Sequence, residues 1–113
     1  MAVGAEFIEF IKDQMSGFAP VGVRRMFGGA GVSYAGVTFA IIVDETLYLK
    51  VGPINAADFD AESLERFSYA AKGGKRIEMS YRRAPSRLLD DTDEMTLWCR
   101  KAHAAALTAN RRD

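Results

Sequence analysis

The stretch from Arg24 to Val51 constrains the fold more than any other part of the chain. β-Branched and aromatic residues are dense within it, and glycine or acidic residues interrupt them at short intervals. This pattern is typical of a meander of antiparallel strands. Ala35-Gly36 fits a tight turn, because glycine accepts positive φ. We predict strands over residues 24–27, 32–34, 37–43 and 47–51.

The segment Val37–Val43 is apolar on both faces. A strand of this kind belongs at the centre of a sheet, covered by helices on at least one side. The turn that follows, Asp44-Glu45, contains no glycine, and a two-residue loop would place Glu45 at an unfavourable positive φ. We therefore predict a longer loop, with this register: Phe39, Ile41 and Val43 opposite Val51, Leu49 and Leu47.

Helical spacing of apolar residues predicts an N-terminal helix over Ala5–Met15. Asn55 is placed to cap a second helix that runs to Glu62 or Glu65 and is anchored by Phe59. A capping box at residues 91–94 predicts the start of a last helix, which continues to about Ala109. The predicted apolar stripe of this helix is Met95, Trp98, Cys99, Ala102 and Ala106.

Gly73-Gly74 is a strong turn signal, and it predicts a hairpin with strands over residues 67–72 and 76–82. Apolar and polar residues alternate along the second strand, which predicts one solvated face that includes Arg82. A short helical turn is expected after Pro85. The predicted fold class is α+β, with an antiparallel meander and a hairpin packed against N-terminal, middle and C-terminal helices in one domain over residues 1–113.

The charge balance argues against a dedicated nucleic-acid binder, because fifteen basic residues offset fifteen acidic ones. Cys99 is the single cysteine, which excludes an intrachain disulfide and favours a cytosolic compartment. The first residues lack the basic start and apolar run of a signal peptide. The longest apolar run, residues 39–43, is far shorter than the ~20 residues of a membrane-spanning helix. We expect a soluble cytoplasmic protein that does not bind membranes.

Several blocks follow one another in a specific order: Arg25-Met26-Phe27-Gly28-Gly29, Gly36-Val37-Thr38-Phe39-Ala40, Leu47-Tyr48-Leu49-Lys50-Val51, Phe67 with Tyr69, Met79-Ser80-Tyr81 with Pro85, and Trp98 with the alanines after it. Their order and spacing resemble the TfoX N-terminal domain family, and the resemblance covers nearly the whole chain. The family takes its name from TfoX, or Sxy, a bacterial regulator of competence genes that acts with the cyclic-AMP receptor protein. TfoX carries a further C-terminal helical domain, which the resemblance implies is absent here, since the chain ends soon after Ala109. The resemblance implies no catalytic residues.

The residues that could carry chemistry each have a structural explanation. Gly28–Gly31 fits neither phosphate-binding glycine pattern and is better explained by a bulge or a close backbone approach. His103 lacks partners and is expected at the surface, while Cys99 is expected to be a buried, inert thiol. Ser80 lacks a nucleophile elbow, and helix capping explains the carboxylates of residues 90–94 better than a divalent cation. We predict no catalytic residues, no metal site, no cofactor and no enzymatic activity.

The basic residues are the remaining candidates for binding, together with two tyrosines between them. The candidate surface comprises Arg24, Arg25, Lys72, Lys75, Arg76, Arg82, Arg83, Arg87, Tyr69 and Tyr81. Gathered on one face, these side chains would hold phosphates or an acidic protein; dispersed, they form an ordinary solvated surface. An open sheet edge, at residues 24–27 or in the hairpin, would also permit homodimerisation.

Two functions follow. The first is a protein-interaction module with a role in transcription or competence regulation, whose protein partner the sequence does not identify. The second is a nucleic-acid-associated transcriptional regulator that binds DNA through the basic hairpin. A small enzyme is the weakest alternative.

Overall fold

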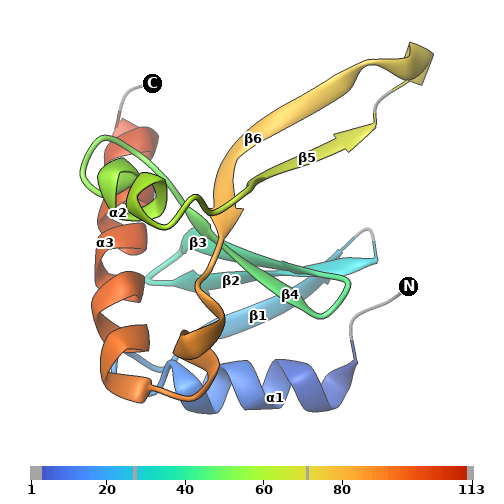
Figure 1. Cartoon of the computed structure of the whole chain (residues 1–113). Helices are drawn as coiled ribbons and strands as arrows, with labels where there is room; N and C mark the ends of the chain where they lie inside the picture. Colours follow the sequence, from blue (N-terminus) through green and yellow to red (C-terminus); the bar gives the residue numbers. More distant parts are fainter. Residues whose placement is uncertain (1–3, 27, 71, 112–113) are drawn as a thin grey trace.

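A computed structural model describes residues 4–26, 28–70 and 72–111, and these form one antiparallel sheet with three α-helices (Figure 1). The elements are α1 (Ala5–Gln14), β1 (Gly22–Met26), β2 (Gly29–Tyr34), β3 (Val37–Val43), β4 (Thr46–Lys50), α2 (Ala56–Ala61), β5 (Arg66–Ala70), η1 (Lys72–Gly74), β6 (Arg76–Arg83), η2 (Ser86–Leu89) and α3 (Thr92–Arg111). The strand order is β1-β2-β3-β4-β6-β5. The predicted α+β class is confirmed, and the hairpin joins the meander in one sheet because β6 pairs with β4.

The third strand lies inside the sheet, between β2 and β4, as predicted. Its buried residues Ala40 and Ile42 belong to one core with Ile11 of α1 and Met95 and Cys99 of α3. Figure 1 shows α1 and α3 packed beside the meander. This strand is also bulged: the register passes from Ser33–Thr38 to Val32–Ala40 and leaves Phe39 without a partner.

The loop after β3 differs from the prediction. Asp44 and Glu45 form a two-residue turn with φ of 51° and 58°, and the register pairs Ile42 with Leu47 and Ala40 with Leu49. The predicted longer loop and register are therefore wrong. Paired residues share a face of the sheet, so this register buries both leucines on the helix-covered side. Burying the two leucines is worth roughly 3–6 kcal/mol, against roughly 2–4 kcal/mol for the two left-handed residues of the turn.

Replacing Glu45 with glycine is expected to stabilise the protein by about 1 kcal/mol relative to Glu45→Ala, because glycine adopts this φ without steric cost. Alanine is the matched control, since both variants remove the hydrogen bond that the Gly4 N–H donates to Glu45 Oε1 at 2.7 Å. Urea denaturation measures the difference. Equal stability of the two variants would contradict a strained turn.

Other predicted elements are present with changed details. The first strand starts at Gly22 and ends at Met26, so the predicted end at Phe27 lies outside the described residues, and β2 starts at Gly29. Asn55 occupies the predicted N-cap position of α2, but its side chain makes no capping hydrogen bond. Its Oδ1 accepts a hydrogen bond from the Gly52 N–H and its Nδ2 donates to the Lys50 carbonyl. Burial explains this difference, because Asn55 is almost fully enclosed and satisfies two backbone groups of the preceding loop.

The remaining helical predictions are confirmed in outline. Phe59 is fully buried in α2, although this helix ends at Ala61. Asp91 Oδ1 accepts the Glu94 N–H at 3.0 Å, as expected of a residue that caps α3. The stripe of α3 is buried at Met95, Cys99, Ala102 and Ala106, with Trp98 partly buried.

Candidate functional site

The β5–β6 hairpin extends away from the helices and from the other strands (Figure 1). We call residues 66–70 and 72–80 the arm, and residues 81–83, which pair with β4, its root. The pairing of β5 with β6 passes from Ser68–Glu78 to Arg66–Arg82, so β6 carries extra residues between the arm and the root. Such an irregularity bends a strand. The bend explains how β6 pairs with β4 at its C-terminal end, residues 81–83, and diverges from the rest of the sheet toward its N-terminal end.

The arm carries large apolar side chains that lack full burial. Tyr69 is 46% exposed and Met79 is 41% exposed. The Phe67 ring lies 5.0 Å from the Tyr48 ring and 6.3 Å from the Tyr69 ring, so these three residues form what we call the aromatic row. Ile77 pairs with Tyr69 and shares its face. The arm therefore presents an apolar face that begins at β4 and continues outward.

The root is fixed by Arg82, which lies in the interior and not on the predicted solvated face. Its Nη1 donates to Asp60 Oδ1 at 2.6 Å, and its Nε and Nη2 donate to the Leu64 carbonyl at 2.9 and 2.6 Å. The guanidinium also lies 5.9 Å from the centre of the Phe59 ring. The prediction for Arg82 is wrong because α2 and the segment after it supply acceptors, Asp60 and Leu64, that the strand pattern does not show.

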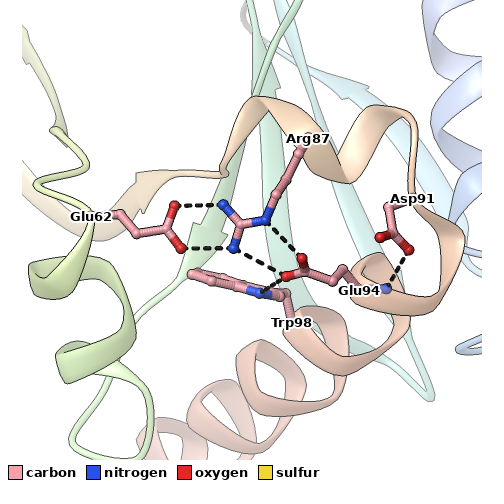
Figure 2. A network of polar contacts seen from close by, with 5 residues as sticks. All are labelled: Glu62, Arg87, Asp91, Glu94 and Trp98. Carbon is pink, nitrogen blue, oxygen red and sulfur yellow. Dashed lines mark hydrogen bonds and ion pairs between the residues drawn. The ribbon is translucent and has the colours of Figure 1, made fainter.

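Arg87 is held between two carboxylates beside the Trp98 ring, as Figure 2 shows. Its Nη1 and Nη2 each donate to one Glu62 oxygen at 2.7 Å, and its Nε and Nη2 donate to Glu94 at 2.7 and 3.1 Å. Trp98 Nε1 donates to Glu94 at 3.2 Å. This network connects the end of α2 with η2 and α3, so Arg87 serves the packing of these elements.

The two carboxylates should make stability depend on pH. Hydrogen bonds from Arg87 lower the pKa of Glu62 and Glu94 below their ordinary value of 4.5. A carboxylate whose pKa is lower in the folded than in the unfolded state stabilises the protein at any pH above its unfolded-state pKa. That stabilisation is lost as the pH falls through the folded-state pKa. We expect the thermal midpoint to fall below about pH 4.5, and to fall less steeply in Arg87→Gln. Lys12→Gln, which removes a 3.7 Å surface ion pair with Glu9, should keep the wild-type slope.

The predicted basic surface is divided among separate places. Arg24 and Arg25 lie on β1, at the opposite edge of the sheet from the hairpin. Arg83 pairs with Glu65 at the root, while Lys75 and Arg76 lie exposed at the outer end of the arm. Arg76 pairs with Ala70 and its Nε donates to Ser68 Oγ at 3.1 Å, so it lies on the face of the arm opposite Tyr69. The side chain of Lys72 is outside the described part of the structure. Tyr81 is only 8% exposed, and burial raises its pKa.

His103 is partly exposed, in keeping with its predicted surface position, and its ring also belongs to an aromatic cluster that the sequence did not predict. Its ring lies within 5.4–5.8 Å of the rings of Phe18, Tyr34 and Phe39, and its Nε2 lies 3.1 Å from the Tyr34 carbonyl oxygen. The cluster forms because the turn after α1 and the turn between β2 and β3 meet this side of α3. Cys99 is fully buried as predicted, and burial raises its pKa to about 12.

Two hollows on the described surface are small or open. One of about 50 Å³ is lined by residues of the β3–β4 turn and of the segment from Arg83 to Leu89. Another of about 360 Å³ lies open between the Pro53-Ile54 loop and Ala105 and Thr108 of α3. Within residues 4–26, 28–70 and 72–111, no three His, Cys, Asp or Glu side chains are grouped as metal ligands. None of the described helices combines the length and apolar character needed to cross a bilayer.

Comparison with known families identifies this arrangement. The model of the TfoX N-terminal domain matches residues 13–106. The chain belongs to the TfoX N-terminal domain family. The matched region includes the whole sheet, the arm and the Arg87 network, so these are parts of the TfoX N-terminal domain. No curated protein sequence matches the chain significantly.

Sequence reasoning found Tyr69 but missed the other members of the aromatic row, Tyr48 and Phe67, as candidate contact residues. A usable signal was present: Phe67 and Tyr69 alternate on a strand that a glycine turn marks as half of a hairpin. No comparable signal connects Tyr48 to them, because that contact joins β4 to β5, which α2 separates in the chain and β6 separates in the sheet.

Proposed function

We propose that this TfoX N-terminal domain is a non-enzymatic protein-interaction module whose contact surface is the arm, and that it acts in transcription or competence regulation. The observation that carries the proposal is the exposure of Tyr69 and Met79, 46% and 41%, on a hairpin that projects from the domain. Family membership supports the regulatory part.

The arm has the physical properties of a protein contact. Tyrosine, phenylalanine and methionine are enriched in protein interfaces, and a face of such residues gains free energy when a partner removes it from water. The root reduces the entropic cost of binding, since Arg82 and the pairing of β6 with β4 hold the arm in place before a partner arrives.

The environment of the reactive side chains supports a role without catalysis. The Cys99 thiol is buried and has a raised pKa, so it stays protonated and enclosed near neutral pH. Arg87 is committed to Glu62 and Glu94, and Arg82 to Asp60 and Leu64. These groups stabilise the fold in their present positions.

The proposal is tested with a double variant, Tyr69→Lys with Met79→Lys, immobilised beside the wild type and a control, Leu97→Lys. Leu97 is 56% exposed on α3, outside the arm, so the control changes an apolar residue that is at least as exposed as Tyr69 and Met79. We expect a saturable partner from cell extract to bind the wild type and Leu97→Lys, and to be lost from the arm variant. Retention by the arm variant would contradict the proposal.

Nucleic-acid binding is a second candidate, because Lys75 and Arg76 lie exposed at the outer end of the arm. It predicts that the domain retards DNA at low salt, with an affinity that falls steeply as salt rises. Lys75→Glu with Arg76→Glu should abolish the retardation, while Arg24→Glu at the far edge should leave it unchanged. Failure to shift DNA at low salt would remove this candidate.

A further inference from the structure

The sheet has two outer strands, β1 and β5. Among the described residues, each pairs with one neighbouring strand, so its other side presents backbone N–H and C=O groups. Such an edge is a template for another strand. The two edges differ in what happens when each meets a copy of itself.

The β5 edge is complementary to itself. An antiparallel pair of β5 strands related by a two-fold axis, with the longest overlap, places Ser68 opposite Ser68 of a second copy. Phe67 then lies opposite Tyr69, and Arg66 lies opposite Ala70. Cross-strand aromatic pairs stabilise a sheet, and no charged residue of β5 faces one of like sign in this pairing.

The β1 edge disfavours the same arrangement. Its central residue is Arg24, so the corresponding two-fold pair sets Arg24 opposite Arg24 of the second copy. Like charges directly opposite one another destabilise a strand pair. Gly22 and Met26 would face each other at the ends and offer a small contact. Charge and side-chain size therefore favour self-association at β5 over β1.

We propose that two copies of this domain associate through β5, which joins their sheets and extends the aromatic row of each across the junction. The proposal rests on the proposed function, and it names a second copy of the chain as a partner of the arm. A contact built on two short strands is smaller than the ~1,200–2,000 Å² of a standard stable interface, so the dimer dissociates in about the micromolar range.

Engineered cysteines test the register directly. Ser68→Cys places two thiols opposite one another at a Cα separation of about 4.5–5.5 Å, within the range of a disulfide. Leu97→Cys is the control, since it places an exposed thiol on α3, away from both sheet edges, and leaves Arg24 in place. The native Cys99 is buried and does not compete. With diamide as oxidant, we expect Ser68→Cys to form a covalent dimer at least ~10-fold faster than Leu97→Cys. Equal rates, or a faster reaction of Leu97→Cys, would overturn the proposal.

Two substitutions at Ala70 test the charge pattern without any cross-link. Ala70→Lys places a positive charge opposite Arg66 of the second copy, and Ala70→Glu places a negative charge there. In sedimentation velocity over about 5–500 µM, we expect Ala70→Lys to raise the dimer Kd about 10-fold relative to Ala70→Glu, because like charges oppose across strands. Arg24→Glu should have the same dimer Kd as the wild type. A monomeric wild type throughout, or Kd values that respond to Arg24→Glu and not to Ala70, would overturn it.

These results separate the dimer from the broader function. A monomeric protein that still loses its extract partner in the Tyr69→Lys, Met79→Lys variant contradicts the dimer and supports the interaction module. A dimer that forms through β5 while the extract partner also binds the arm variant supports the dimer and contradicts the arm as the site for other proteins.

Discussion

Replacing Arg82 with alanine is expected to lower the free energy of unfolding by about 2–4 kcal/mol, a large share of the stability of a small domain. The change removes three charge-assisted hydrogen bonds to Asp60 and Leu64 and the contact with the Phe59 ring. It also leaves the Leu64 carbonyl without these donors. Urea denaturation followed by circular dichroism measures the loss.

Arg83 provides the matched control, because it is the next residue of the same strand and also forms an ion pair. Its side chain is 48% exposed and its partner Glu65 is 67% exposed, with 3.3 Å between the charged atoms. We expect Arg83→Ala to change the stability by less than about 1 kcal/mol. Hydrogen exchange of the arm should accelerate in Arg82→Ala and not in Arg83→Ala. Similar effects of the two substitutions would show that Arg82 does not anchor the root.

The second large effect is expected at Gly29, where alanine should destabilise the protein by about 2–3 kcal/mol. A Cβ atom at this position would lie 2.5 Å from the Ile42 carbonyl oxygen. That oxygen belongs to β3, so it can move only if the pairing of β2 with β3 shifts. The glycine-rich segment is thus explained by a close approach of two backbones, as the sequence suggested. Thermal and urea denaturation test the prediction.

Gly31 is the control within the same strand. A Cβ atom there would also meet an atom at 2.5 Å, but that atom is the terminal methyl of Met26. Met26 is 41% exposed, and its flexible end can rotate away. We expect Gly31→Ala to change the stability by less than about 1 kcal/mol, since a smaller unfolded-state entropy offsets the local adjustment. Equal losses for both variants would contradict the backbone contact at Gly29.

Local patterns were sufficient to predict most elements of this fold. The density of β-branched residues marked the meander, Gly73-Gly74 marked the hairpin, and the spacing from Met95 to Ala106 marked the buried face of α3. These features depend on residues close together in the chain, where periodicity and turn chemistry act directly. The family resemblance, now shown, used the same blocks in their order.

Features that depend on distant parts of the chain were not predictable in this way. The β3–β4 register follows from the burial of Leu47 and Leu49 beneath helices, and that burial outweighed an unfavourable turn residue. Arg82 finds its acceptors 18 and 22 residues away, so alternation alone assigned it to the wrong face. The position of His103 likewise depends on Tyr34, 69 residues earlier.

The candidate site was predictable only in part. Tyr69, Lys75 and Arg76 were identified from the sequence and all belong to the arm, although Arg76 lies on the face opposite Tyr69, and Arg24 and Arg25 lie at the other edge of the sheet. Strand order decides this separation, and it is set by how β6 joins β4, which no local pattern reveals. The projection of the arm has the same origin, since it follows from the shift in pairing along β6.

The central claim is that the arm is where this domain contacts other proteins. Its most direct test replaces Tyr69 with a photo-crosslinking amino acid in living cells, and Leu97 with the same group as the control. The account predicts a discrete, saturable adduct from position 69, absent from position 97. Adducts that form from position 97 and not from position 69 would contradict it.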